Sequence, residues 1–474
     1  MDKTSAPFRM NLHKHLKGAD MRIKSVSQRY FDFSEPSSLK VVEAYRQKYQ
    51  ALSDLLDANP QLLVVAHRDW AKLLSSSNKG RRSGFTSEQL LRSLVVQFVE
   101  QLSYRDTVIR IDTSEFLRHF VRLGPGSTMD YSLLSKAFGW LSAEAVAAMN
   151  AVLNAYAVSQ GKISGEKHRL DTTVYEANIH YPTDSSLLWD SFRTVARLIR
   201  GIQQERPELG FHHRFHDKKV KKLSTFIGRN AASKSKATQR QVKQHYRVLI
   251  ARVRWIHGVG QNVLAQLGLA GYDAPDLAHY LPLVHQIVTQ ADQRVLQGRK
   301  LPADEKLYSL FEEHTELIKR GKASKPIEFG HKILLAQTGE KFIHHYEVMA
   351  QRCDDKDLLG PALEAHRDLF GCYPALVAAD KGFYESKKQL TALEGKIQTV
   401  SIAKKGRRNP DEQARESSEA FVDGQRFRAG VEGSISVLKR AFRLGRCLFK
   451  GFKNYAASVG LAVLCHNLVL LTRL

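Results

Sequence analysis

Five short runs of β-branched, aromatic and other apolar residues constrain the fold of this chain more than any other feature of its sequence. The runs cover residues 168–174, 329–337, 342–349, 375–379 and 397–402. Clusters of Gly, Asp or Lys bound them, which is typical of β-strands. Helical periodicity accompanies the later runs, at residues 360–370, 385–395 and 425–443. This alternation predicts an α/β fold with a mixed five-stranded sheet.

A long interval separates the first two of these runs. Residues 187–325 show helical periodicity throughout, for example at Val242, Tyr246 and Leu249. A structureless loop of this length would argue against the strand assignment, whereas a helical insertion domain does not. From Arg193 to Arg254 the chain carries 17 Lys or Arg against three acids, so much of its excess positive charge is concentrated here.

A further helical segment precedes the strands. Thr86 and Glu88 are typical of a helix start, and apolar residues then recur at three- and four-residue spacing. Residues 1–85 form a polar segment that ends in the basic linker SSSNKGRRSG. The predicted domains are this segment, a helical domain at 86–160, an α/β core at 161–186 and 326–474, and a basic helical insertion at 187–325.

The charge balance points to a polyanionic partner. Lys and Arg number 72 against 48 Asp and Glu, which gives a net charge of +24. With 43% hydrophobic residues the chain can bury a core, which excludes a mainly disordered basic protein. The four cysteines lack C-x-x-C spacing and are expected to be buried free thiols.

Neither a signal peptide nor a membrane span is expected. The first twenty residues contain no continuous apolar run, and no uncharged apolar stretch approaches the roughly 18 to 20 residues of a span. The most apolar segment, residues 459–471, is therefore interpreted as a buried closing helix. We expect a soluble cytoplasmic protein with no membrane partner.

Three carboxylates occupy places where a shared site could form. Asp171 lies inside the first strand, Asp380 directly follows the fourth, and Glu432 lies in the helix after the fifth. In an open α/β sheet, functional groups gather at the ends of neighbouring strands. Three converging acids need a cation, and oxygen ligands without thiols favour Mg²⁺ or Mn²⁺. Two such ions would suit phosphoryl transfer, although an Asp after a strand is also a common turn former or helix cap.

The sequence around each acid carries a resemblance. The stretches are LDTTVYEANIHYPTDSS at 170–186, AADKGFYES at 378–386 and RAGVEGSISVLKRAFRLGR at 428–446, supported by TSEQLLRSLV, SYRD and AVLCHNLVLL elsewhere. With these blocks the chain resembles the bacterial insertion-sequence transposases of the DDE type, the cut-and-paste class. The resemblance covers most of residues 86–474 and implies a ribonuclease-H-like core.

The resemblance also implies roles for individual residues. Asp171, Asp380 and Glu432 match the three catalytic acids, which would bind the two metal ions. Arg428, Glu432 and Lys439 match three members of the family's Y-x2-R-x3-E-x6-K signature, and Gln425 stands where the signature has tyrosine. Separations of four and seven residues place the three matching side chains on one helix face. Arg428 and Lys439 would then hold DNA phosphates, unless this face is a solvated salt-bridge surface.

Further basic residues are candidates for DNA contact. Lys381, beside Gly382, either places a cation near the scissile phosphate or forms the turn after a strand. A second group forms a loop whose dense like charges favour a polyanion nearby. This group comprises Lys404, Lys405, Arg407 and Arg408.

Other residues have two interpretations each. The cluster of His212, His213 and His216 is interpreted as a solvated basic face rather than a metal site, because no paired carboxylate or thiol accompanies it. Trp189 and Trp255 flank the basic insertion and either stack on a displaced base or belong to a core. Arg105 and Arg118 are possible base or phosphate contacts if the 86–160 domain places a recognition helix in the major groove.

Together these features predict a nucleoid-associated transposase. It would cleave double-stranded DNA at the terminal inverted repeats of an insertion sequence and join the 3′-hydroxyl ends to target DNA, acting as a homodimer in the synaptic complex. Two alternatives remain: a nuclease that shares the core but lacks strand transfer, and a DNA-binding regulator without catalysis. The recognised end sequence, the target preference and the role of residues 1–80 do not follow from the sequence.

Overall fold

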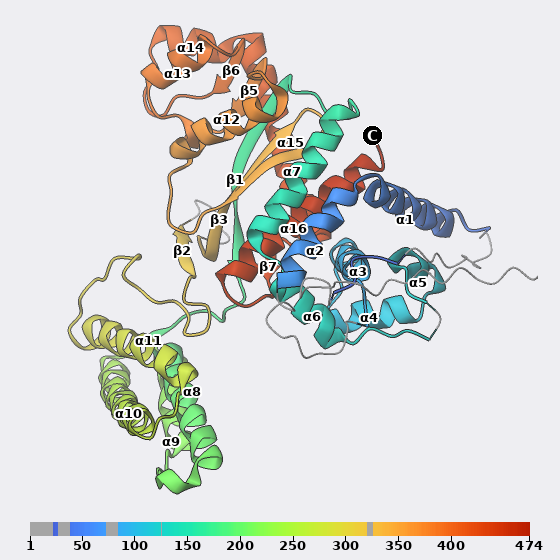
Figure 1. Cartoon of the computed structure of the whole chain (residues 1–474). Coiled ribbons are helices and arrows are strands. Elements are labelled where there is room, and N and C mark those ends of the chain that lie inside the picture. Colours follow the sequence, from blue (N-terminus) through green and yellow to red (C-terminus); the bar gives the residue numbers. More distant parts are fainter. Residues whose placement is uncertain (1–21, 27–37, 73–83, 125, 320–325) are drawn as a thin grey trace, which may run out of the picture. The chain divides into compact units, whose positions relative to one another are not determined.

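The computed structural model describes residues 22–26, 38–72, 84–124, 126–319 and 326–474 (Figure 1). The chain divides into two compact units. The first comprises the described residues up to Tyr175 together with 332–474, and the second comprises 176–331. Most of the predicted linker SSSNKGRRSG lies outside the described residues.

Helices form the N-terminal part of the first unit. Thr86 caps the helix expected after the linker, and its capping-box partner is Gln89. Glu88 instead forms ion pairs with Arg92 and Arg122. The helices are α1 (Lys40–Ala58), α2 (Pro60–Lys72), α3 (Ser87–Val99), α4 (Tyr104–Asp112), α5 (Glu115–Val121), α6 (Tyr131–Trp140) and α7 (Ala143–Ser159).

Helices α1 and α2 fall within the segment for which the sequence predicted only polar character. Some of their apolar residues are nevertheless buried with the rest of the helical core, including Tyr49, Leu52 and Trp70. The Trp70 ring nitrogen donates a hydrogen bond to the Ala137 carbonyl, which ties α2 to α6. An average over 85 residues hides such a narrow apolar stripe, because only a few side chains on each of these helices are buried.

A mixed sheet forms the centre of the α/β part. Its order is β2-β3-β1-β5-β6, with β4 paired to β3 and β7 paired to β1. β5 is parallel to both β1 and β6, whereas β3 and β4 are antiparallel. The strands are β1 (Lys167–Ala177), β2 (Glu316–Lys319), β3 (Ile327–Thr338), β4 (Ile343–Val348), β5 (Leu376–Ala379), β6 (Thr399–Ile402) and β7 (Arg446–Cys447).

The five predicted strands correspond to β1, β3, β4, β5 and β6, so the sheet has seven strands rather than five. β2 pairs with the start of β3, ahead of the part of β3 that pairs with β4. β2 and β7 have only four and two residues. Runs this short carry no readable alternation of side chains, which explains why the sequence did not predict them.

Helices after the strands complete the first unit. They are α12 (Leu359–Phe370), α13 (Lys387–Glu394), α14 (Pro410–Ser417), α15 (Glu419–Ala441) and α16 (Phe452–Leu471), with 3-10 turns η4 (Asp355–Leu358) and η5 (Lys381–Phe383). By length and composition α16 could cross a membrane, as could α6 and α7 if that bent pair were one span. The apolar segment is thus longer than expected, but 83% of its most apolar window is buried inside the protein, as in a core helix.

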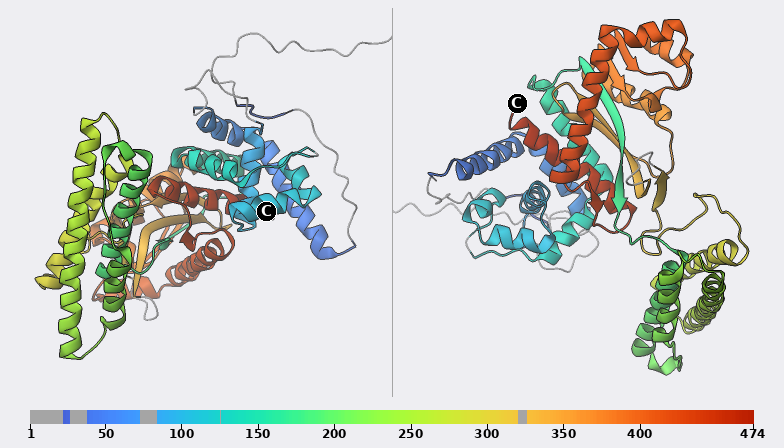
Figure 2. Two further views of the ribbon diagram at one scale, coloured as in Figure 1. Left: turned by 90° about the horizontal axis from the view of Figure 1, so that it is seen from below. Right: turned by 180° about the vertical axis from the view of Figure 1, so that it is seen from behind.

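Long helices form the second unit, which has its own apolar core (Figure 2). α10 packs against the other three helices, and residues such as Phe192, Val253 and Ile256 are buried between them. The basic side chains of this unit lie mostly outside that core. The helices are α8 (Asp184–Glu205), α9 (Asp217–Asn230), α10 (Lys236–Leu269) and α11 (Pro275–Ala291).

Candidate active site

Asp171 lies inside β1, and Asp380 directly follows β5, the parallel neighbour of β1. The register pairs His168 with Val377 and Arg169 with Ala378. The pairing ends there, and continuing it by two positions would set Asp171 opposite Asp380. Residues paired in this way direct their side chains to the same face of a sheet, with the strands about 4.8 Å apart. Two blocks of the sequence motif that lie far apart along the chain thus place their acids on, or directly after, two neighbouring strands.

Backbone amides hold both carboxylates in place. An Asp171 oxygen accepts a hydrogen bond of 2.7 Å from the Thr172 amide. The Asp380 side chain caps η5 by accepting a hydrogen bond, also 2.7 Å, from the Gly382 amide. Asp380 is therefore a helix cap, which is one of the two roles that its place after a strand suggested. Capping uses one carboxylate oxygen and leaves the second for another partner.

Arg428 links Asp171 to Glu432. Its guanidinium nitrogens lie 3.8 Å from an Asp171 oxygen and 3.6 Å from a Glu432 oxygen. The Asp171 side chain is 17% exposed, whereas that of Glu432 is 68% exposed. The positive charge between them offsets the repulsion that two nearby carboxylates would otherwise feel. Glu432 therefore joins the site through Arg428, at its solvent-exposed side.

Glycines let α15, which carries Arg428 and Glu432, approach the sheet closely. A Cβ atom on Gly424 would overlap the Ser401 Cβ in β6, and one on Gly430 would overlap the Arg169 guanidinium from β1. Arg169 in turn donates a hydrogen bond to the Phe427 carbonyl of α15. These contacts fix the distance between α15 and the strands, and thereby the position of Glu432.

Gln425 replaces the aromatic residue of the family signature with a backbone contact. Its amide nitrogen lies 2.7 Å from the Ser401 carbonyl and 3.2 Å from the Ala379 carbonyl. These carbonyls belong to β6 and β5, and Ala379 directly precedes Asp380. Gln425 therefore braces the strand ends rather than presenting a ring or hydroxyl at this position.

Asp355 is a fourth acid at this site that the sequence motif did not indicate. One of its oxygens lies 2.8 Å from the Lys332 ammonium and accepts a 3.2 Å hydrogen bond from the Thr172 hydroxyl. Its other oxygen would lie 2.9 Å from a Cβ on Gly382, and an Asp380 oxygen would lie 2.7 Å from the same atom. The Asp355 and Asp380 carboxylates therefore close around Gly382. The acid-rich run CDDKD was a signal, but it did not indicate which of its three acids turns inward.

The donor set suits a hard cation. Asp171, Asp380 and Asp355 offer oxygen ligands with no thiol or imidazole among them, which matches the preference of Mg²⁺ and Mn²⁺. The acids are more spread out than a preformed single-ion cluster. In the described part of the chain, the only group of three or more potential ligands within 4.8 Å of one another consists of histidines elsewhere.

The predicted DNA-contacting cations differ in their surroundings. The Lys439 ammonium donates a hydrogen bond to the Val174 carbonyl of β1, so it anchors α15 to the strand. Lys381 is exposed beside Asp380. Lys404 and Arg408 form ion pairs with Glu412 and Glu416 of α14.

Two residues of the basic loop remain directed outward. The Lys405 side chain is exposed, and its ammonium donates a hydrogen bond to the Gly382 carbonyl. That contact brings the loop to the turn that Asp380 caps. Arg407 is also exposed. The loop is thus held by local acids on one side and reaches the candidate site on the other.

The remaining candidates have mainly structural contacts. Arg118 binds Asp112 and the carbonyls of Gly124 and Ser127, so it closes its own loop. Arg105 stacks on the Tyr131 ring. Among the exposed members of the second unit are His212, His213, His216 and, at 40% exposure, Trp255.

One tryptophan and the cysteines complete the set of sequence candidates. Trp189 packs against the core of its own unit. The cysteines are free, and Cys447 and Cys465 are buried as expected, but Cys372 is exposed.

Comparison with known families adds a finding that is independent of the geometry. Residues 312–468 match the model of the transposase DDE domain. This segment contains Asp355, Asp380 and Glu432 but begins after Asp171. No curated protein and no solved structure matched the chain.

Proposed function

We propose that this chain, which carries a transposase DDE domain at residues 312–468, is a DNA transposase that cuts the ends of an insertion sequence and joins them to target DNA. The observation that carries the proposal is the placement of the motif acids on neighbouring elements. Asp171 lies on β1, Asp380 follows its parallel neighbour β5, and Glu432 shares Arg428 with Asp171. The parallel β1, β5 and β6 and the antiparallel β3 and β4 support a ribonuclease-H-like core.

The catalytic roles follow from charge and position. Asp171, Asp380 and Glu432 would hold two Mg²⁺ or Mn²⁺ ions, with Asp355 as an additional oxygen ligand beside Asp380. Such ions, when bound, supply the charge that activates water or a 3′-hydroxyl and stabilises the leaving oxygen. Arg428 would turn toward a DNA phosphate once cations neutralise the acids that it now contacts. No side chain is then needed as a covalent nucleophile.

The basic residues would position the DNA. Lys381 and Lys405 are exposed beside Asp380, where they would bind phosphates that flank the cleaved bond. The helical domain and the basic second unit would bind the terminal inverted repeats, and two copies would pair the two ends. The protein would act in the cytoplasm on nucleoid DNA.

Conservative substitution of the acids tests the catalytic assignment. Asp171→Asn, Asp380→Asn and Glu432→Gln remove one negative charge each, so we expect end cleavage with Mg²⁺ to fall by on the order of a hundredfold to a thousandfold. Cleavage is measured on labelled DNA ends, and DNA binding is measured alongside. Glu419→Gln, an exposed change at the start of the same α15, is the matched control and should cleave normally. Unchanged cleavage by all three acid variants would refute the assignment.

Pre-cleaved ends separate the alternative functions. Supplied with such ends and a target plasmid, a transposase gives joined products, whereas a nuclease with the same core gives none. A DNA-binding regulator would neither cleave nor join. The gathering of acids disfavours the regulator, because carboxylates near a polyanion weaken binding unless cations offset them.

A further inference from the structure

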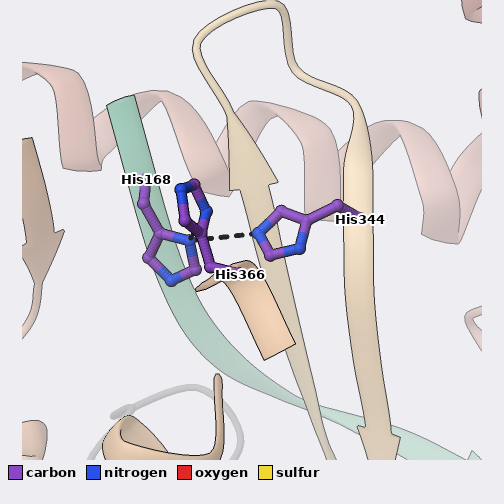
Figure 3. Close-up of side chains that lie close together, drawn as sticks. All are labelled: His168, His344 and His366. Carbon is purple, nitrogen blue, oxygen red and sulfur yellow. Dashed lines mark hydrogen bonds between the residues drawn. The ribbon is translucent and has the colours of Figure 1, made fainter. Parts of the chain in front are cut away.

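Three histidines from separate elements meet in the interior of the first unit. His168 lies near the start of β1, His344 near the start of β4 and His366 on α12. Figure 3 shows the three rings turned toward one another. The side chains of His168 and His366 are inaccessible to solvent, and His344 is 6% exposed. The proposed phosphoryl transfer gives none of the three histidines a role, and none of them is one of the motif acids.

The facing nitrogens are spaced like metal ligands. His168 Nδ1 lies 3.2 Å from His366 Nδ1 and 3.0 Å from His344 Nε2, and one nitrogen from each ring lies within 4.8 Å of the others. Zinc–nitrogen bonds are about 2.0–2.1 Å long, so two nitrogens on one tetrahedral ion are about 3.3 Å apart. These two separations would need to open by only about 0.1–0.3 Å to match that spacing.

Hydrogen bonding among the rings alone does not satisfy them. His366 Nε2 lies 3.0 Å from the Gly165 carbonyl, to which it must donate its proton, so in the neutral ring Nδ1 carries a lone pair. His168 Nδ1 faces both His366 Nδ1 and His344 Nε2 but carries at most one proton, so it can donate a hydrogen bond to only one of them. Within the described part of the chain, His168 Nε2 and His344 Nδ1 are buried without a hydrogen-bond partner.

The surroundings keep the rings neutral and in place. Burial holds the pKa of His168 and His344 well below the usual value and lowers that of His366 to about 4, so the nitrogens are free of extra protons. The Phe370 ring packs on His366 and His344, with centroids 4.6 and 5.9 Å away. His366 continues the buried stripe of Leu359, Ala362 and Leu363 on α12, where an apolar residue would ordinarily stand.

We propose that His168, His344 and His366 form a buried structural site for a first-row transition-metal ion, with Zn²⁺ as the occupant. The ligand atoms are Nδ1 of His168, Nε2 of His344 and Nδ1 of His366. Imidazole nitrogens select such ions over Mg²⁺, which prefers oxygen. The hydrogen bond from His366 to the Gly165 carbonyl is the kind of outer contact that orients a metal-binding histidine.

The ion would fasten β1, β4 and α12 to one another. His168 lies three residues before Asp171 on β1, so the fastening would hold the strand that carries a candidate catalytic acid. Because all three ligands are neutral, we expect weaker binding than at sites with thiolate ligands. The ion would contribute stability to the folded protein without taking part in cleavage.

Metal content and thermal stability test the site in the full-length protein. Protein purified from zinc-supplemented medium should contain about one tightly held Zn²⁺ per chain. A chelator should lower its melting temperature by several degrees, and Zn²⁺, but not Mg²⁺, should restore it. His344→Gln and His366→Gln should lose this ion. His345→Gln changes the neighbouring histidine on β4, which is not one of the three ligands, and should keep it.

The candidate active site must be excluded as the source of bound zinc. The zinc content and the melting temperature are therefore also measured for a double variant, Asp171→Asn with Asp380→Asn. This variant should still bind Zn²⁺ if the histidines are the ligands. X-ray absorption at the zinc edge should report nitrogen ligands from imidazole, and it decides the matter on the wild-type protein even if the histidine variants do not fold. Wild-type protein without bound zinc and without a zinc-dependent melting shift would overturn the proposal, as would zinc that disappears with the carboxylates.

Discussion

At Gly382 of the candidate active site, the addition of a single carbon atom would disturb two carboxylates. Its position leaves no room for a side chain between the Asp380 and Asp355 carboxylates, since a Cβ would come within 2.7 and 2.9 Å of their oxygens. Both acids would have to move, and Asp380 would also lose the geometry in which the Gly382 amide donates to it. The site therefore depends on this residue having no side chain.

Gly382→Ala is expected to lower end cleavage by on the order of a hundredfold, because small displacements of catalytic groups cost that much. The measurement is the cleavage rate with Mg²⁺, together with the melting temperature. Gly360→Ala, at a helical glycine with open space around it, is the control and should cleave normally. A fully active Gly382→Ala enzyme would show that Asp355 and Asp380 need not keep this spacing.

Individual residues also show where sequence reasoning ends. That Asp171 lies inside a strand and that Asp380 directly follows one could be predicted, because each is placed by a strand pattern. The place of Asp355 at this site could not be predicted, since it depends on the short turn η4 and on an ion pair with Lys332 of β3. Lys439 fits the expected helix face, yet its contact with the Val174 carbonyl depends on how closely α15 approaches β1.

At the scale of an element, α15 shows how close packing positions an acid. Its glycines have different surroundings. Gly424 faces Ser401 of β6, whereas a Cβ on Gly433 would meet no atom within 4 Å outside its own helix. The same substitution at these two positions should therefore have effects of opposite sign.

Gly424→Ala should lower the free energy of unfolding by about 1–3 kcal/mol, because the added methyl group meets Ser401 and forces the helix away from the sheet. Gly433→Ala should raise it by about 0.5–1 kcal/mol, because alanine loses less backbone entropy than glycine in a helix. Urea denaturation of both variants measures the two changes. Equal shifts in one direction would mean that α15 does not dock through Gly424.

Sequence patterns predicted helices that have several turns and strands that coincide with runs of apolar residues. The five expected strands and the helix over most of α15 have enough residues to establish a period, and Thr86 marks the start of α3. β2 and β7 are too short for this, and α1 and α2 bury too few side chains. The three-histidine cluster is equally hidden, because its members come from three elements and no spacing connects them.

At the scale of the whole molecule, the net charge of +24 should make DNA binding steeply dependent on salt. The second unit offers a test on α9, where Lys218, Lys221, Lys222 and Arg229 line one shallow surface depression. Replacing Lys218 and Lys222 by Gln should weaken binding and reduce the salt slope by about 0.9 for each phosphate that the protein no longer neutralises. Binding is measured by fluorescence anisotropy over a range of salt concentrations.

Lys388→Gln provides the comparison, because it removes an exposed charge from α13 in the other unit. It should leave the slope nearly unchanged. If the α9 variant also left the salt slope of DNA binding unchanged, Lys218 and Lys222 would not contact DNA phosphates.

The separation of β1 from its partners has a consequence for biosynthesis. β3 begins 150 residues after β1 ends, since residue 327 follows residue 177 by that number. At roughly 5–20 residues per second, a ribosome needs about 8–30 s to make the intervening chain. During that time a strand that carries Asp171, and that is largely buried in the folded protein, has emerged without the neighbours that will cover it. A nascent chain of this protein should therefore depend on chaperones until the second half of its sheet has been translated.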